Sequence, residues 1–289
     1  MTWVQAHMGT LYIVGTPIGN LEDITLRAIR TLREVALIAA EDTRHARILL
    51  QRYDIDTPLI SYFEHSSEEK RRRILKTLKG EDVALISEAG MPGLSDPGYD
   101  LIREAIECGI RIVPVPGPSA LTSALAVSGL PTDSFVYLGF LPRRRHERRR
   151  TLEELADERR TLVLYEAPHR LVSTLRDMLA ILGDRHVAVA RELTKLHEEI
   201  FRGTLSQALE RFEAAPPRGE FTLVIEGTGR TERQSRHDAG EALALARKLI
   251  DSGSSAREAT AEVARRTGWS RRAIYNWLHH ADSQPTSGD

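Results

Sequence analysis

Short apolar runs alternate with amphipathic segments over the first two-thirds of the chain. Runs of strand length, rich in Val, Ile and Leu, lie at 11–14, 35–40, 83–86, 110–113, 135–138, 161–164, 186–189 and 221–225. Between most of them apolar residues recur at helical spacing, as at Leu26, Ile29 and Leu32 and within 100–108, 148–156 and 171–182. This alternation predicts an α/β fold with a largely parallel sheet.

Two breaks, near 128–131 and 227–231, divide the pattern. They predict an α/β domain over 9–130, a second α/β domain over 131–230 and a small helical domain over 233–281. The length of 289 residues agrees with two or three domains. Residues 1–8 show no pattern that bears on the fold.

Composition excludes several classes of protein. Cys108 is the only cysteine, so an intramolecular disulfide and a multi-cysteine metal site are impossible. His45, His65 and His169 stand apart without metal-ligand spacing, and we expect no metal. No apolar run approaches the ~20 residues that span a bilayer, and the N-terminus lacks signal-peptide features, so we expect a cytoplasmic protein and no membrane partner. The net charge of -1 means that any nucleic-acid binding must use a local basic patch.

Loops rich in Gly and Pro follow three of the predicted strands, at 15–19, 87–98 and 114–120. Ligands of open α/β sheets bind beyond the carboxyl ends of the strands, where glycine allows close approach of the backbone. The loop at 15–19 has neither the Rossmann nor the Walker A spacing, which disfavours NAD and ATP. The loops predict a cleft for another ligand.

Charged residues mark two further places. Glu41, Asp42 and Arg44 follow a strand end, where they can orient a polar substrate or assist proton transfer. Asp42 or Thr43 can also cap the next helix, and the two roles can coexist. Six arginines lie within 143–150, which is typical of a solvated face but also fits a local phosphate site.

Several motifs, taken in order, resemble one family. They lie at 11–21, 40–44, 95–99, 115–120, 139–142 and 190–195. The chain resembles the small-subunit ribosomal RNA methyltransferase I family of the tetrapyrrole methylase superfamily, from about Gly9 to Gly227 and more weakly beyond. Members use S-adenosylmethionine (SAM) to methylate the ribose 2′-oxygen of cytidine-1402 in 16S rRNA. The resemblance implies two α/β domains with SAM in the cleft between them, 16S rRNA or the 30S subunit as partner, and a homodimer.

The resemblance also implies a set of cofactor-binding residues. Matched by motif, they are Pro17, Ile18, Leu94, Ser95, Asp96, Ser119, Ala120, Tyr165, Glu166, Ala190 and Thr222. The chain departs from the family at Glu88, which replaces an Asp, and at Met91, which replaces a Thr. Met91 lacks the hydroxyl, so we expect no polar contact from it.

Methyl transfer to a ribose hydroxyl needs the oxygen in line with the methyl group and needs its proton removed. We hypothesise that Glu41 or Asp42 accepts or relays the proton, with Glu192 as the alternative base. Arg44 and Lys195 are predicted to hold RNA phosphate.

The C-terminal segment predicts helices over 239–252, 255–264 and 270–279, with a helix-turn-helix-like turn at 265–270. Cations and aromatic residues interleave there, which favours RNA binding; they are Arg265, Arg266, Arg271, Arg272, Tyr275 and Trp277. We expect Trp269 and Leu278 in the core. A helical bundle for dimerisation is the alternative.

Two other functions fit parts of the sequence. A precorrin-type tetrapyrrole methyltransferase would share fold and cofactor, but a small macrocycle needs neither the helical tail nor the arginine run. A non-catalytic RNA-binding protein would not need the intact cleft loops. The sequence therefore favours a SAM-dependent RNA 2′-O-methyltransferase.

Overall fold

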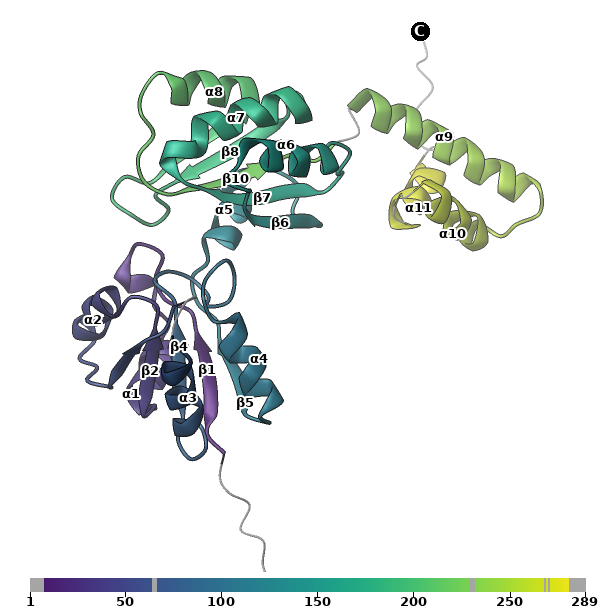
Figure 1. The fold of residues 1–289 in the computed structure, drawn as a ribbon. Helices are drawn as coiled ribbons and strands as arrows, with labels where there is room; N and C mark the ends of the chain where they lie inside the picture. The colour runs from purple at the N-terminus through teal and green to yellow at the C-terminus, as the bar shows by residue number, and fades with distance from the viewer. Residues whose placement is uncertain (1–7, 64–66, 229–231, 268, 270, 281–289) are drawn as a thin grey trace, which may run out of the picture. The chain divides into compact units, whose positions relative to one another are not determined.

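The computed structural model describes residues 8–63, 67–228, 232–267, 269 and 271–280 (Figure 1). The chain forms two compact units, one through Thr228 and one from Gly229 onward, and each is described by itself. No helix among the described residues is long and apolar enough to cross a membrane.

The first sheet is parallel throughout. Its strands are β1 (Thr10–Val14), β2 (Leu37–Ala40), β3 (Leu59–Ser61), β4 (Val83–Ile86) and β5 (Arg111–Val115), in the order β3-β2-β4-β1-β5. The run predicted at 35–40 begins as a strand only at Leu37, because Val35 still caps the preceding helix. Strand β3 was not predicted, since three residues are too short to show a period.

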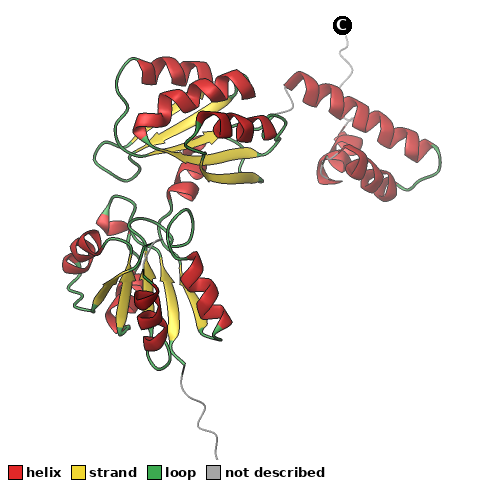
Figure 2. Ribbon diagram, in the orientation of Figure 1, coloured by secondary structure: helices red, strands yellow, loops and turns green. Residues whose placement is uncertain are grey.

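Helices cover both faces of this sheet (Figure 2). Helices α1 (Leu26–Glu34) and α2 (Thr43–Arg52) pack on one face, and α3 (Glu68–Thr77) and α4 (Tyr99–Glu107) on the other. A 3₁₀ turn, η1 (Leu21–Asp23), precedes α1. Every residue of β2 and β4 is buried, as expected for strands of a parallel sheet covered on both sides.

Helix α5 (Ala120–Ser128) follows the first sheet in sequence but packs on the second. Its Ala124 and Leu125 are buried against Val163, Ala188 and Val224 of the second sheet. Judged by its packing, α5 belongs with the second sheet, although it lies before the predicted domain boundary at residue 130.

The second sheet is mixed. Its strands are β6 (Phe135–Phe140), β7 (Thr161–Glu166), β8 (His186–Arg191), β9 (Glu199–Thr204) and β10 (Phe221–Ile225), in the order β6-β7-β10-β8-β9. Strands β6 and β7 are parallel, whereas the pairs β7–β10, β10–β8 and β8–β9 are antiparallel. The prediction of a largely parallel sheet is wrong for this half. The predicted strand–helix alternation breaks there, because β8 runs into the unpredicted edge strand β9 without a helix between them.

Three helices cover the face of the second sheet opposite α5. They are α6 (Arg145–Glu154), α7 (Pro168–Leu182) and α8 (Leu205–Glu213), and their apolar residues join one buried cluster with Leu162, Leu164 and Leu223. The helices predicted at 148–156 and 171–182 are confirmed, each beginning three residues earlier than expected.

The second unit contains α9 (Glu232–Asp251), α10 (Ala256–Thr267) and α11 (Arg271–His280), which confirms the three predicted helices. Ala242, Ala246, Val263 and Ile274 form its core, and Trp269 and Leu278 pack against it as expected. Trp277, which the sequence groups with the predicted RNA contacts, is partly buried and also packs there, its ring 4.7 Å from that of Trp269. Positions 268 and 270 of the predicted turn and the side chain of Arg265 lie outside the described residues.

Candidate active site

The loops after β1, β4 and β5 are bound to one another by their backbones. Gly15 N donates to Val115 O at 3.0 Å, and Thr16 and Gly90 exchange two hydrogen bonds of 2.9 and 3.0 Å. Gly15 and Gly117 are in direct contact, because a Cβ on Gly117 would lie 2.8 Å from the carbonyl oxygen of Gly15. These contacts fix the floor of a site at the carboxyl edge of the first sheet, as the sequence predicts.

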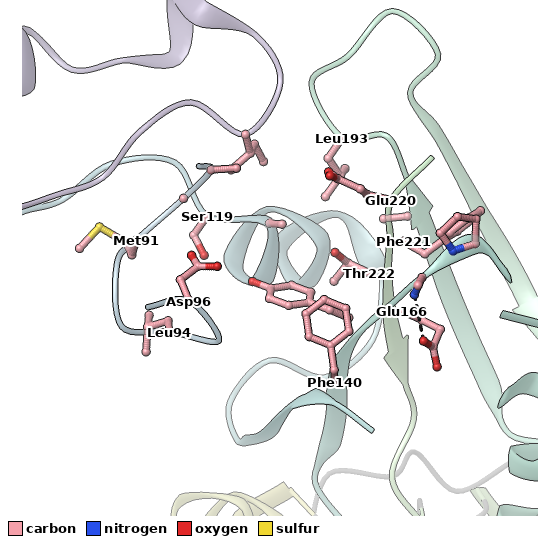
Figure 3. Close-up of a pocket in the computed structure, with 18 residues that line it drawn as sticks. Met91, Leu94, Asp96, Ser119, Phe140, Glu166, Leu193, Glu220, Phe221 and Thr222 are labelled. Carbon is pink, nitrogen blue, oxygen red and sulfur yellow. Dashed lines mark hydrogen bonds between the residues drawn. The ribbon is translucent and has the colours of Figure 1, made fainter. Parts of the chain in front are cut away.

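A hollow of about 280 Å³ lies above this floor, between loops of the first sheet and strand ends of the second (Figure 3). Its walls are mainly apolar. Nine of the eleven predicted cofactor residues line it: Ile18, Leu94, Asp96, Ser119, Ala120, Tyr165, Glu166, Ala190 and Thr222. The hollow has the apolar lining with few polar groups that is typical of small-molecule sites.

Two predicted cofactor residues lie elsewhere. Pro17 lines the adjoining hollow described below. Ser95 lines neither hollow, and its hydroxyl is 2.7 Å from that of Tyr137. Ser95 has a φ of 63°, a conformation that L-residues rarely adopt. It therefore shapes the loop beside the first hollow.

Several lining residues escaped prediction, among them Phe140, Leu193, Glu220 and Phe221. Phe140 and Leu193 lie within motifs that carry the family resemblance, Phe221 is the first residue of a predicted strand, and Glu220 directly precedes it. Their place in a family motif or at the end of a predicted strand was the signal that could have identified them. Met91 lines the hollow as well.

Glu166 lies on the wall, but its carboxylate is committed to the protein. It accepts hydrogen bonds from Thr174 Oγ1 at 2.6 Å and Ala167 N at 2.9 Å, and Arg170 Nε is 3.2 Å away. A buried carboxylate needs such partners because desolvation destabilises its charge. Glu166 therefore anchors the start of α7.

A second hollow, of about 360 Å³, adjoins the first and shares Ile18, Ala89, Asp96 and Glu220 with it. Its walls are more polar. The ionisable residues that line it are Glu41, His45, Glu88, Asp96, Lys195 and Glu220. His45 Nδ1 lies 2.9 Å from Glu88 Oε1, so the Glu that replaces the family's Asp is paired with histidine. His65 lies outside the described residues, among which no group of acidic, His or Cys side chains is placed to hold a metal.

Of the predicted catalytic residues, Glu41 and Lys195 line this second hollow, whereas Asp42, Arg44 and Glu192 line neither. Asp42 is the N-cap of α2, which confirms the capping prediction. It accepts from the backbone N–H of Arg44 and pairs with its guanidinium, both at 2.7 Å. These bonds hold the pKa of Asp42 far below its usual range, which makes it a poor proton acceptor.

Lys195 lies between two carboxylates, with Nζ 2.9 Å from Glu192 and 3.0 Å from Glu220. Burial alone would raise the pKa of Glu192, but the bonds from Lys195 and from the backbone N–H of Glu220 outweigh it and lower the pKa. Glu192 and Thr194 have φ values of 50° and 65°, so this loop is strained where it meets Gly19. Such strain persists only where surrounding contacts impose it.

Asp96 has the most unusual carboxylate of the site. Burial, and next the charge of Glu41, raise its pKa to about 7, although a hydrogen bond from Ser87 acts in the opposite direction. A carboxyl group that titrates near neutral pH in a pocket is a candidate for proton transfer.

The arginine run lies in and just before α6, and three of its six arginines bind one aspartate. Arg148, Arg149 and Arg145 converge on Asp177 at 2.6, 3.1 and 3.4 Å. Arg148 and Asp177 are buried. The interpretation as a phosphate site is wrong for Arg148, whose charge is used inside the protein; the side chains of Arg145 and Arg149 are 71% and 36% exposed, and for them it stays a prediction.

A family model described as Tetrapyrrole (Corrin/Porphyrin) Methylases matches residues 10–209. The chain belongs to the tetrapyrrole methylase family. Similar members include a protein of Halalkalibacterium halodurans, 49% identical over 94% of this chain and 95% of its own, and one of Thermotoga maritima, 57% identical over 76% and 99%. Both are named "Ribosomal RNA small subunit methyltransferase I".

The fold is shared with a solved structure of uroporphyrin-III C-methyltransferase from Thermus thermophilus in complex with S-adenyl homocysteine. It superposes with a TM-score of 0.54 at 21% identity, over 75% of this chain and 97% of that one. As a tetrapyrrole methylase, this chain is a methyltransferase whose methyl donor is SAM.

Proposed function

We propose that the chain transfers the methyl group of SAM to the ribose 2′-oxygen of a cytidine in 16S rRNA, cytidine-1402 in the family it resembles. The observation that carries the proposal is the pair of adjoining hollows: one apolar, one polar and acidic, with shared walls. A donor in one and an acceptor in the other would meet at the shared wall, as direct methyl transfer requires. The names of relatives 49% and 57% identical to this chain support the choice of RNA.

The first hollow suits SAM. Ile18, Ala190 and Phe221 offer apolar walls for a heterocycle, and Thr222 and Ser119 offer hydroxyls. When bound, SAM supplies a methyl group on a positively charged sulfur. The carboxylates of the neighbouring hollow favour that cation over the neutral product.

The second hollow suits a ribose and a base better than a phosphate. Four carboxylates, those of Glu41, Glu88, Asp96 and Glu220, face it alongside Lys195 and His45. Because like charges repel, the RNA backbone would lie outside. Lys195, already paired with two carboxylates, positions the loop and Glu220 rather than holding phosphate. Arg44, whose side chain is 84% exposed, remains a phosphate contact in this proposal.

The partners follow from the same proposal. The acceptor is 16S rRNA, free or within the 30S subunit, in the cytoplasm. The helical unit over 233–281 adds RNA contacts through its exposed arginines. The family resemblance implies a homodimer, which light scattering on the purified protein would test.

The test is transfer of labelled methyl from SAM to 30S subunits that lack the modification, followed by mapping of the labelled nucleotide. We expect one 2′-O-methyl group on one cytidine. Binding of SAM without transfer to 30S subunits or naked RNA would overturn the proposal in favour of a small-molecule acceptor.

A further inference from the structure

We propose that Asp96 is the general base of the methyl transfer and accepts the proton of the ribose 2′-hydroxyl at the wall shared by the two hollows. This inference rests on the proposed function. It names a catalytic residue that the sequence indicated only as a cofactor contact.

The position of Asp96 carries the argument. Of the residues that line both hollows, only Asp96 and Glu220 are ionisable. Glu220 is 75% exposed at its side chain and bonded to Lys195 at 3.0 Å. Figure 3 shows Asp96 reaching into the hollow from the first-sheet loops, opposite Glu220 and Thr222. Asp96 is thus the carboxylate that can face the donor and acceptor sites together.

The other candidate bases are less well placed. Glu41 lines the second hollow alone, and its Oε2 lies 3.3 Å from the backbone N–H of Glu88. Asp42 caps α2 and pairs with Arg44. Glu192 Oε1 accepts from both Lys195 Nζ and Glu220 N. Each of these three carboxylates therefore has a structural role, because it accepts hydrogen bonds from other groups of the protein.

The chemistry balances with one proton acceptor. The 2′-oxygen gives its proton to a carboxylate oxygen of Asp96 and forms a bond to the methyl carbon. The carbon–sulfur bond breaks, and its electron pair stays on sulfur, which becomes a neutral thioether. The balance is complete with SAM, the hydroxyl and the carboxylate, so the step needs no further reactant.

The surroundings keep Asp96 suited to this task. Glu41 and Glu88 raise its pKa by their negative charges, Tyr165 faces it from β7, and Lys195, His45 and Glu220 lie on the same hollow. Burial is the largest cause, and the pKa is about 7. A base is most effective when its pKa is near the working pH, because it is then both ionised and able to hold a proton.

The experiment compares Asp96→Asn with wild type in two assays. We expect kcat for methylation of 30S subunits to fall by about 10²–10⁴-fold, the usual contribution of a general base. Because Asp96 also lines the hollow proposed for SAM, kcat is measured at SAM concentrations that saturate each variant, set from the Kd for SAM measured by calorimetry. A full rate in Asp96→Asn overturns the inference, and so does a loss of activity that is explained by lost SAM binding.

A pH profile separates Asp96 from Glu41. In wild type, kcat/KM should rise with pH through about 7, the pKa of Asp96. Glu41→Gln should keep a measurable rate, reduced because Glu41 lines the proposed acceptor hollow, with the midpoint moved to lower pH because a negative neighbour is gone. Glu88→Gln should shift the midpoint in the same direction by less. Inactivity of Glu41→Gln at every pH, with SAM still bound, overturns the assignment in favour of Glu41. If wild type itself methylates no RNA, the proposed function fails instead.

Discussion

Arg148 and Asp177 form a buried ion pair between α6 and α7, with Nη2 2.6 Å from Oδ2. Arg145 and Arg149 bond the other carboxylate oxygen of Asp177. Burial alone would raise the pKa of Asp177, but the three guanidinium groups outweigh it and lower the pKa. A stretch whose sequence is typical of a basic surface therefore forms ion pairs that hold α6 against α7 over the second sheet.

Removing Asp177 should unfold the protein more easily. Asp177→Ala leaves the buried Arg148 without a counter-charge, and we expect the free energy of unfolding to fall by about 3–5 kcal/mol. Urea titration followed by circular dichroism measures it. The matched control is Glu154→Ala, which breaks the exposed pair with Arg150 and should cost at most about 1 kcal/mol. If both variants lose the same small free energy of unfolding, the ion pairs of Asp177 add no more stability than an exposed pair does.

Gly117→Ala should damage both stability and cofactor binding. The new Cβ would lie 2.8 Å from the carbonyl oxygen of Gly15, and backbone cannot rotate away as a side chain can. We expect a loss of about 1–3 kcal/mol and weaker SAM binding, because Ser119 and Ala120, which line the hollow, lie in the same loop. Gly80→Ala is the control, since nothing lies within 4 Å of its Cβ. If Gly117→Ala binds SAM as tightly as wild type does, the loops that contain Gly15 and Gly117 can move apart to make room for the added methyl group.

Asp96→Asn should be more stable than wild type at high pH. The folded-state pKa of about 7 exceeds the ordinary value of 3.8, so the native state binds more protons between those values. Stability therefore falls as pH rises from 4 to 7, and the full cost of the charge is present above 7. We expect the substitution to add about 1–2 kcal/mol at pH 8, after discounting for solvent screening, and almost nothing at pH 4. Thermal melts at both pH values test this, and an advantage that does not grow with pH would contradict it.

The sequence predicted the elements well wherever burial follows a simple period. Strands at 83–86 and 221–225 were predicted to the residue, because every position is buried and nearly all are apolar. Strand direction in the second sheet was not predictable in this way, since an apolar run has the same pattern whether its strand is parallel or antiparallel to its neighbours. The packing of α5 on the second sheet also depends on contacts far along the chain.

Most residues that line the first hollow were predictable from the sequence, because they follow strand ends, where motif and topology agree. The proposed base was not predictable, because charge type alone does not distinguish a helix-capping carboxylate from a general base. Asp42 and Asp96 are both aspartates in family motifs, yet Arg44 lowers the pKa of the first, and burial beside Glu41 raises that of the second. The difference lies in three-dimensional neighbours, and it is the reason why Asp96 and not Asp42 is the proposed base.

Exposed arginines of the helical unit should govern the salt dependence of RNA binding. Arg271 and Arg272 are exposed on the first turn of α11, whereas Trp277 of the same helix packs into the core. The double variant Arg271→Ala/Arg272→Ala should bind 16S rRNA more weakly. The slope of log K against log salt should fall by about 1 for each lost phosphate contact. Filter binding at several salt concentrations measures both.

The control for this pair is Arg103→Ala on α4, an exposed arginine that bonds Glu107 at 3.2 Å. Its removal should leave the slope unchanged, and neither variant should alter the Kd for SAM. If the double variant keeps the wild-type slope, Arg271 and Arg272 do not contact RNA phosphate. A concentration-dependent loss of dimer in that variant would then favour the alternative, a bundle that joins two copies of the chain.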